Sequence, residues 1–179
     1  MGYTYFGKRV VSGNPYRPLY SEKVRTPKGK VLEYFFLGGK DCSITVSFDE
    51  AGLIILNRQH RHGNKRVMTE VQMGRVEDGE TPRQAALREL REETGYVPKR
   101  IEKLAVLYDE PPYKMQKMHF FIATGCRKSF ETELEDGEDI TVLLKQPAEA
   151  LRLATARKGS DRTFVTAILL ANHRRPELF

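Results

Sequence analysis

The chain has 179 residues, of which 40% are hydrophobic and 30% are charged. This length supports one domain with a sizeable core, or one domain and a small appendage, and the composition is that of an ordinary globular protein. The longest apolar runs, such as 52–56 and 167–171, are too short to cross a bilayer, so we expect no membrane partner. The net charge of +6 favours anionic substrates, but the basic residues are dispersed, so nucleic-acid binding is not expected.

The two cysteines, Cys42 and Cys126, have no metal-ligand spacing. The N-terminus also lacks the apolar segment of a signal peptide. Together, these two features indicate reduced thiols in a cytoplasmic protein.

Residues 1–43 differ from the rest by their density of tyrosine and phenylalanine. A turn signal at 27–29 separates 23–25 from 31–36, which predicts a β-hairpin. So small a sheet is not stable alone and must pack on the main domain or on a second subunit. We therefore predict an N-terminal β-region over 1–43 and a main domain over 44–179.

The main domain opens with two expected strands, 44–48 and 53–56, joined by a polar turn. The polar stretch that follows contains His60 and His62. No cysteine or third histidine stands at usable spacing, so we expect surface histidines rather than a zinc site.

The stretch from Gly74 to Tyr96 organises the chain. Thr81 is a predicted N-cap, Pro82 suits the first helical position, and Gln84 completes a capping box. Gly95 is placed to end the helix in a left-handed conformation. These signals predict a helix over 82–94.

Three carboxylates, Glu89, Glu92 and Glu93, share one side of that helix. Like charges so placed repel unless a counter-charge is present, and Arg88 can reach Glu92. Oxygen-only ligands favour Mg²⁺, Mn²⁺ or Ca²⁺ over zinc. The alternative is a solvated, glutamate-rich helix face.

The whole stretch matches every position of the Nudix box and therefore resembles the Nudix hydrolases. That resemblance implies hydrolysis of the phosphoanhydride in a nucleoside diphosphate linked to another group. It implies catalytic roles for Arg88, Glu92 and Glu93, with Arg88 orienting the carboxylates by an ion pair. It also implies Glu89, Glu92 and Glu93 as metal ligands and Glu80 as a supporting loop residue.

Other segments resemble the ADP-ribose pyrophosphatase subfamily. The run at 58–61 reads RQHR where the subfamily has RQYR, and Gln72-Met73 stand where it has a Pro-Ala pair. A proline, Pro111, stands 16 residues after Gly95, and a proline near that distance marks the subfamily. The resemblance implies three substrate-binding residues and one further metal ligand: Arg61, Glu70 and Pro111, and the main-chain carbonyl of Met73.

An acidic segment over 127–139 is expected to be a loop before a strand at 140–144. The run from Gly137 to Ile140 resembles the subfamily loop that delivers a glutamate to the metal cluster. The resemblance implies that Glu138 is the general base or orients the attacking water, with Glu135 as the alternative.

Further strands are expected over 101–108 and 117–123, with His119 facing either the cleft or the core. Two helices are expected in the tail, one from Pro147 to Lys158 and one capped by Asp161 and ending near His173.

The expected fold is α/β: a Nudix α/β/α sandwich with a mixed β-sheet and an N-terminal antiparallel β-appendage. The expected function is Mg²⁺-dependent hydrolysis, with Mn²⁺ as a substitute, of ADP-ribose to AMP and ribose 5-phosphate by a homodimer. N-terminal tyrosines and phenylalanines are the hypothesised clamp for the base. The alternatives are another substrate (GDP-mannose or another NDP-sugar, NADH, a dinucleoside polyphosphate, an RNA 5′ end) or a non-catalytic nucleotide sensor.

Overall fold

A computed structural model describes residues 2–156 and 160–179 and divides the chain into two compact units. The first unit contains the chain up to Asp41 together with Leu107–Met118, and the second contains Cys42–Val106 and His119–Phe179. The strands are β1 (Thr4–Asn14), β2 (Arg17–Arg25), β3 (Val31–Leu37), β4 (Cys42–Asp49), β5 (Ile54–Arg61), β6 (Arg66–Glu70), β7 (Gln72–Arg75), β8 (Tyr96–Val97), β9 (Arg100–Tyr108), β10 (Lys117–Lys128) and β11 (Ile140–Lys145). The helices are α1 (Pro82–Thr94), α2 (Pro147–Ala154), α3 (Arg162–Arg174) and the short 3₁₀ helix η1 (Pro176–Leu178).

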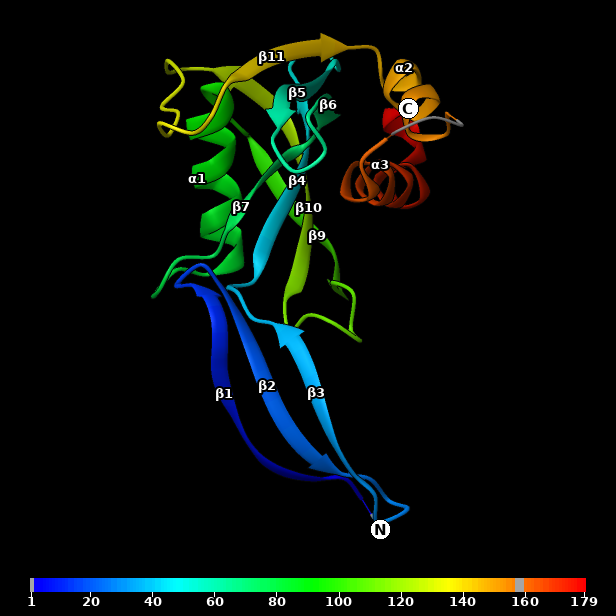
Figure 1. Cartoon of the computed structure of the whole chain (residues 1–179). Helices are drawn as coiled ribbons and strands as arrows, with labels where there is room; N and C mark the ends of the chain where they lie inside the picture. Colours follow the sequence, from blue (N-terminus) through cyan, green and yellow to red (C-terminus); the bar gives the residue numbers. More distant parts are fainter. Residues whose placement is uncertain (1, 157–159) are drawn as a thin grey trace. The chain divides into compact units, whose positions relative to one another are not determined.

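The first unit is built on an antiparallel sheet in the order β1-β2-β3 (Figure 1). The expected hairpin is present, with Arg25 paired to Val31 and Gly29 at φ 81° in the turn. Strand β1 was not expected from the sequence. It turns into β2 at Asn14, whose Oδ1 accepts hydrogen bonds of 2.9 Å from the main-chain N–H groups of Tyr16 and Arg17. This Asx-type turn closes the pair without the usual glycine-rich dipeptide.

The segment that carries Pro111 belongs to this first unit. The main-chain N–H of Leu37 donates to the carbonyl of Tyr113 at 2.7 Å, and Met115 N–H donates back to Leu37 at 3.2 Å. Gln116 adds a 2.6 Å hydrogen bond from its side chain to the carbonyl of Lys40. The loop is therefore held to the end of β3 by main-chain pairing.

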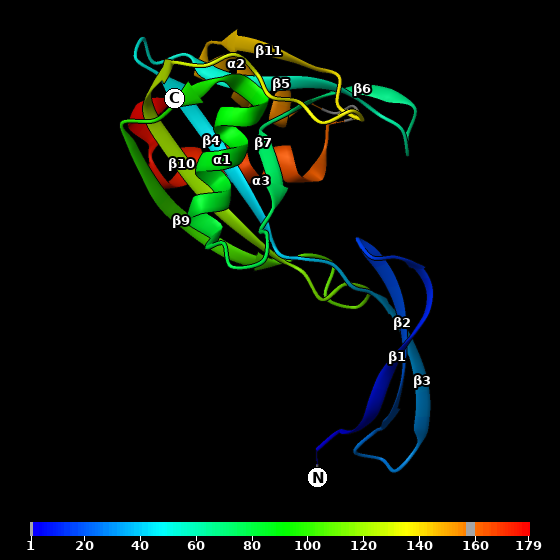
Figure 2. The ribbon, with the colours of Figure 1, turned by 90° about the vertical axis from the view of Figure 1, so that its left-hand side faces the viewer.

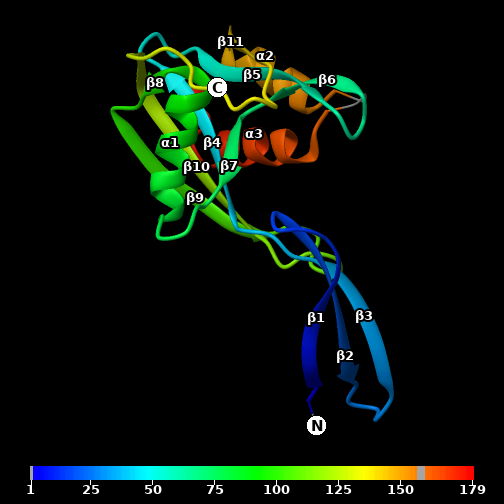
Figure 3. The same cartoon turned by 60° about the vertical axis from the view of Figure 1, so that its left-hand side comes forward.

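The second unit contains a sheet in the order β11-β5-β4-β10-β8, with β6 paired to β5, β7 to β4, and β9 to β10. Helix α1 covers one face of this sheet, and α2 and α3 cover the other (Figures 1 and 3). This arrangement confirms the expected α/β/α sandwich with an N-terminal antiparallel β-region.

Strand β4 separates two chemically different layers, because successive side chains on a strand face opposite sides of the sheet. Ile44, Val46 and Phe48 are buried on one face. The small polar side chains that alternate with them are also buried, and Ser43 Oγ donates to the carbonyl of Pro82 at the start of α1 at 2.6 Å. The face beneath α1 (Figure 2) therefore includes buried polar groups, which must be hydrogen-bonded to be stable there.

The α1 side also has an apolar cluster: Ile55, Leu90, Ala123 and Cys126. Cys42 and Cys126 are both buried thiols, and burial raises the pKa of the Cys126 thiol to about 12. A thiol with so high a pKa carries almost no thiolate at neutral pH, so Cys126 is a packing residue.

The tail differs from expectation in one helix. Helix α2 ends at Ala154 rather than continuing to Lys158, because Thr155 leaves the helical conformation. The Thr155 hydroxyl also donates to the carbonyl of Leu151 at 2.9 Å, which caps the last turn. The last two residues of the expected extent, 157 and 158, lie outside the described residues. Helix α3 starts as expected, with Asp161 Oδ2 accepting from Phe164 N–H at 2.8 Å. Across the described ranges 2–156 and 160–179, every helix is too short or too polar to span a bilayer.

Candidate active site

Helix α1 presents the candidate carboxylates, and its two ends form as the sequence predicts. Thr81 N–H donates to Gln84 Oε1 at 2.9 Å, and Gln84 N–H donates to Thr81 Oγ1 at 3.3 Å, which completes the capping box. Pro82 occupies the first helical turn, and Gly95 ends the helix at φ 75°. Local capping therefore fixes where each glutamate stands on the helix.

Both glycines that bracket the stretch are required by close contacts. A Cβ on Gly74 would lie 1.8 Å from Glu89 Cδ, because the Glu89 carboxylate rests directly against β7. A Cβ on Gly95 would lie 2.1 Å from the carbonyl oxygen of Phe130. The carbonyl of Gly95 accepts from Ser129 N–H at 2.9 Å, so this glycine also joins α1 to the loop after β10.

We expect Gly74→Ala to reduce activity far more than stability. The clashing group is the end of a flexible glutamate, so the new methyl is accommodated by moving Glu89 rather than the backbone. The melting temperature should fall by a few degrees at most, equivalent to about 1 kcal/mol, while turnover falls on the order of 100-fold. Steady-state kinetics with thermal denaturation measure both. Gly79→Ala is a matched control for the loop, although its φ of 81° makes it mildly strained. Equal losses of turnover in the two variants would contradict the contact with Glu89.

Arg88 joins the loop glutamate to the helix glutamates. Its Nε and Nη2 bind the two oxygens of Glu80 at 3.0 and 3.1 Å. Its Nη1 donates to Glu89 Oε1 at 2.6 Å and to Glu92 Oε2 at 3.0 Å. Nη2 also donates to the carbonyl of Arg75 at 2.9 Å. The hydrogen bonds to Glu80, and then the charge of Glu89, hold the pKa of Arg88 well above its ordinary value, so the guanidinium is a permanent counter-charge.

Glu93 lies deepest of the three helix carboxylates and is 5% exposed. Its Oε2 accepts from Asn57 Nδ2 at 2.8 Å and from Met73 N–H at 3.3 Å. Burial, followed by the charge of Glu89, raises the pKa of the Glu93 carboxyl well above its ordinary value. Burial also raises the pKa of Glu89, and Arg88 opposes that rise in part. The site concentrates more negative charge than Arg88 alone neutralises.

The acidic loop brings Glu138 to this cluster. The charge of Glu138 contributes to the raised pKa values of both Glu89 and Glu93. A tight turn holds it, in which Glu138 N–H donates to Glu135 O at 2.9 Å and Glu135 N–H donates to Glu138 Oε2 at 3.1 Å. Glu135 itself is exposed. Of the two glutamates considered from the sequence, Glu138 is therefore the one whose charge reaches the helix carboxylates.

Arg61 and Glu70 form an ion pair across the β5–β6 hairpin. Arg61 Nε lies 2.8 Å from Glu70 Oε1 and 3.0 Å from Oε2, and Glu70 is buried. The pair raises the pKa of Arg61, and the charges of Glu93 and Asp161 add to the effect. Arg61 is thus within electrostatic reach of the carboxylate cluster.

Comparison with known proteins agrees with this geometry. The NUDIX domain model matches residues 42–167, which includes α1 and the acidic loop. The chain belongs to the Nudix family.

Among its Nudix relatives, the chain is 32% identical over 151 residues to an ADP-ribose pyrophosphatase of Bacillus subtilis, covering 84% of this chain and 82% of that protein. It is 25% identical over 162 residues to a methanol dehydrogenase activator of Bacillus methanolicus, covering 90% and 87%. The crystal structure of an ADP compounds hydrolase superposes with a TM-score of 0.82 at 19% identity, covering 99% of this chain and 96% of that one. This Nudix protein is therefore a pyrophosphohydrolase that resembles the ADP-ribose pyrophosphatases.

The donor set of this Nudix site fits a hard divalent cation. Glu89, Glu92 and Glu93 offer carboxylate oxygens only, which suit a hard divalent cation. Burial raises the pKa values of Glu89 and Glu93, and neighbouring carboxylates add to the rise, so a positive charge placed there would stabilise their ionised forms. Within the described part of the chain, no three Cys, His, Asp or Glu side chains already converge as a finished metal cage. Arg88 occupies oxygens of Glu89 and Glu92, so ligation requires these side chains to rearrange.

The remaining candidate residues are three histidines and Pro111. His60 and His62 are exposed, as expected. His119 is buried, which favours the core position over the cleft. Pro111 lies in the first unit, where it lines a cavity of about 540 Å³ walled by aromatic side chains: Tyr3, Tyr5, Tyr34 and Phe36.

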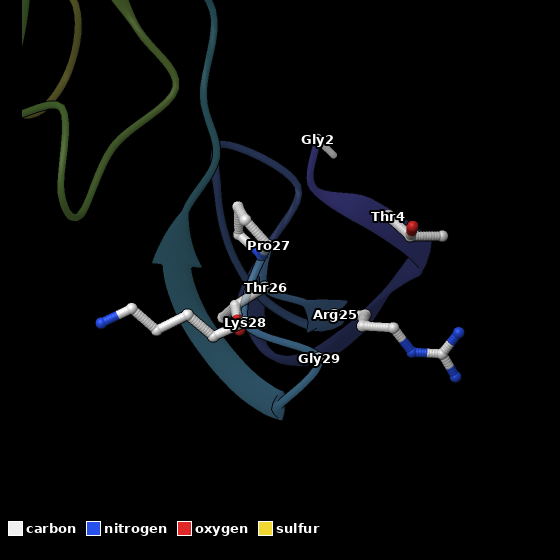
Figure 4. Close-up of a pocket in the computed structure, with 7 residues that line it drawn as sticks. All are labelled: Gly2, Thr4, Arg25, Thr26, Pro27, Lys28 and Gly29. Atoms are coloured by element: carbon white, nitrogen blue, oxygen red, sulfur yellow. The ribbon is translucent and has the colours of Figure 1, made fainter.

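A second cavity in the first unit has no converging chemistry. It lies at the turn between β2 and β3 and is lined by Gly2, Thr4 and residues 25–29. Figure 4 shows the side chains of Arg25 and Lys28 extending in opposite directions, away from each other. Two cations so arranged do not hold one anion, so we assign no site there.

Two residues close to the carboxylates were missed in the sequence. Asn57 contacts Glu93 directly, and Gln72 contacts Asn57 at 3.2 Å. The available signal was a polar amide directly after a buried apolar residue: Asn57 follows Ile54–Leu56, and Gln72 follows Val71. A buried amide requires a partner, so such a position marks a polar site beneath a helix.

Proposed function

We propose that this Nudix protein hydrolyses the pyrophosphate bond of a nucleoside diphosphate-linked compound with Mg²⁺, and that ADP-ribose is its substrate. The products are AMP and ribose 5-phosphate. One observation carries the proposal: three carboxylates share one side of α1 within the NUDIX match, where Arg88 binds Glu89 and Glu92, and where the pKa values of Glu89 and Glu93 are raised. The 32% identity to an ADP-ribose pyrophosphatase supports the choice of substrate.

Glu89, Glu92 and Glu93, with the main-chain carbonyl of Met73, are the residues that would hold the cation; Mn²⁺ is an acceptable substitute. Bound there, Mg²⁺ supplies charge neutralisation on the diphosphate and makes water more acidic at neutral pH. Arg88 orients Glu89 and Glu92 from one side, and Glu80 fixes the plane of the Arg88 guanidinium.

Glu138 is the proposed base. Its carboxylate takes a proton from a water molecule while the water oxygen forms a bond to one phosphorus of the diphosphate. The bond from that phosphorus to the bridging oxygen breaks, and the bridging oxygen leaves on the other phosphate. The turn that holds Glu138 suits this role, because its two hydrogen bonds with Glu135 fix the carboxylate on the loop.

We expect Glu138→Gln to lower kcat by about 100-fold to 1,000-fold, the usual range for a general base. KM should change by less than about threefold, because the carboxamide keeps the shape and the acceptor oxygen of the side chain. The matched control is Glu135→Gln, which removes the same charge from the exposed end of the same turn. An unchanged rate in Glu138→Gln would place the base elsewhere, and an equal loss in both variants would indicate an effect of net charge.

Arg61 and Glu70 are proposed to bind the substrate. Glu70 holds the Arg61 guanidinium in the plane of the ion pair, and Arg61 remains 40% exposed, so it can also bind a phosphate oxygen. Pro111 is proposed to contact the substrate as part of the aromatic cavity of the first unit, whose tyrosines suit stacking on a base.

The experiment that tests the proposed function is product analysis by chromatography with a panel of substrates. ADP-ribose, NADH, GDP-mannose and a dinucleoside polyphosphate are each incubated with and without Mg²⁺. We expect metal-dependent release of AMP from ADP-ribose at the highest kcat/KM. Faster turnover of another compound would keep the reaction and replace the substrate. Binding of ADP-ribose without product would support a nucleotide sensor.

We also propose that the protein is a homodimer in which the first unit provides the contact. That sheet exposes large apolar side chains, including Tyr5, Phe6, Val10 and Phe35, each more than half exposed. A patch of this kind on a small sheet marks an interaction surface. Light scattering of the full chain is the measurement, and a strictly monomeric mass at micromolar concentration would overturn the assignment.

A further inference from the structure

A chain of hydrogen bonds runs through the buried polar layer beneath α1 and ends on Glu93. Ser47 Oγ donates to Gln72 Oε1 at 2.7 Å. Gln72 Nε2 donates to Asn57 Oδ1 at 3.2 Å. Asn57 Nδ2 donates to Glu93 Oε2 at 2.8 Å. The first three residues, which we call the amide relay, are 0%, 1% and 2% exposed in that order, so water does not replace a lost partner.

The amide relay has a single direction. Gln72 Nε2 also donates to the main-chain carbonyl of Ile55 at 3.1 Å, and a carbonyl can only accept. This contact orients the amide of Gln72, with its nitrogen toward Ile55 and its oxygen toward Ser47. Asn57 must then turn its oxygen toward Gln72 and its nitrogen toward Glu93. A flip of either amide would bring two acceptors or two donors together.

The amide relay fixes the position of one oxygen of Glu93. Asn57 Nδ2 and the Met73 N–H both donate to Oε2, from the side of the sheet. Two fixed donors on one oxygen prevent the carboxylate from rotating. Because both donors bind Oε2, Oε1 is the oxygen that they leave available to another partner.

We propose that Ser47, Gln72 and Asn57 are positioning residues for the hydrolytic reaction, which hold Glu93 so that Oε1 is its ligand atom. The inference rests on the proposed function, in which Glu93 binds the divalent cation. Groups that orient a metal ligand change metal affinity or activity by about 10-fold to 100-fold.

Gln72 makes the amide relay a property of this chain. It stands where the ADP-ribose pyrophosphatase pattern has a proline, and proline has no side-chain amide. If an apolar residue stood at position 72, Oδ1 of the buried Asn57 would lose the hydrogen bond that Gln72 Nε2 donates to it. Gln72, which replaces that proline, therefore occurs together with two polar partners: Asn57, and Ser47 on β4.

The test uses three variants of the full-length chain. Gln72→Met keeps the volume and removes the amide, Ser47→Ala removes only the far end of the amide relay, and Asn57→Ala removes its contact with Glu93. Thr45→Val is the matched control, because it removes a buried hydroxyl from the same face of the same strand outside the amide relay. The readouts are kcat and KM for ADP-ribose with Mg²⁺, the melting temperature, and the Mn²⁺ dissociation constant by electron paramagnetic resonance without substrate.

We expect Gln72→Met to lower kcat and Mn²⁺ affinity each by about 10-fold, with KM within about twofold. Asn57→Ala should lower both at least as much. Adding Gln72→Met to Asn57→Ala should change neither further, because the contact that transmits the effect is already absent. Ser47→Ala should show a smaller loss in the same direction, and Thr45→Val none.

Unchanged kcat and Mn²⁺ affinity in folded Gln72→Met would overturn the proposal, as would full additivity in the double variant. If Gln72→Met does not fold, an unchanged Mn²⁺ affinity in both Ser47→Ala and Asn57→Ala overturns it instead. If the wild type does not hydrolyse ADP-ribose but the variants still weaken Mn²⁺ binding, the amide relay stands and the substrate assignment fails. A wild type that does not bind Mn²⁺ overturns both.

Discussion

Replacing Glu93 by glutamine is expected to lower kcat by roughly 1,000-fold, because a metal ligand contributes several kcal/mol to transition-state charge stabilisation and each 1.4 kcal/mol is tenfold in rate. The glutamine keeps the shape of the side chain, and its oxygen can still accept from Asn57. Steady-state kinetics at saturating Mg²⁺ measure the loss. Glu131→Gln, on the exposed acidic loop, is the control for a change of one charge. Near-normal activity of Glu93→Gln would remove Glu93 from the metal site.

The same substitution should raise stability in the absence of metal. The folded state raises the pKa of Glu93 above its unfolded value, so the folded state binds the proton more tightly. Stability contributed by the protonated carboxyl is therefore present below the unfolded pKa and is lost as the pH rises toward the folded pKa. Above the ordinary value of 4.5, the metal-free wild type should lose stability with increasing pH, and Glu93→Gln should lose less. Thermal denaturation in EDTA across pH 5–8 measures the difference, and a lower melting temperature for Glu93→Gln at pH 8 would contradict it.

Replacing Arg88 by alanine is expected to affect both stability and activity. Glu80, Glu89 and Glu92 would all lose the guanidinium that they share. Breaking a buried ion pair typically costs 3–5 kcal/mol, but Arg88 is 29% exposed, so we expect about 2 kcal/mol. Turnover should fall on the order of 100-fold, because the two helix carboxylates lose their common orientation.

Two further variants separate charge from geometry at Arg88. Arg88→Lys keeps the positive charge but lacks the planar guanidinium, whose separate nitrogens bind Glu80 and Glu89 at the same time. Compared with Arg88→Ala, it should therefore recover stability more than turnover. Arg83→Ala, an exposed arginine on the same helix, should change neither. Urea denaturation and steady-state kinetics measure the two quantities. Full activity in Arg88→Lys would show that the site needs only a nearby charge.

The sequence by itself determined the helix that carries the carboxylates. Its capping box joins residues three apart, and its last residue needs a left-handed glycine, so every contact that defines 82–94 is local. The same holds for the common side shared by Glu89, Glu92 and Glu93, which follows from helical periodicity alone. The hairpin of β2 and β3 was likewise predictable from its turn.

Other features depended on strands that meet only in the folded chain. The pairing of Arg61 with Glu70 needs the register of β5 with β6, and the proximity of Glu138 to Glu89 needs the acidic loop to return to α1. Strand β1 was missed because its glycines and exposed polar residues give no clear alternation, and it is stabilised by pairing with β2. Pro111 was placed with the substrate by resemblance, whereas main-chain hydrogen bonds hold its loop to β3.

The amide relay shows the physical reason most clearly. Ser47, Gln72, Asn57 and Glu93 come from four separate elements. In the sequence, the first three look like ordinary polar residues of their own segments. Burial in the folded chain makes their hydrogen bonds important. At the surface, water could replace a lost hydrogen bond, but between α1 and the sheet it cannot. Local geometry thus set where the carboxylates stand on their helix, and tertiary packing decided which oxygen of Glu93 is free to act.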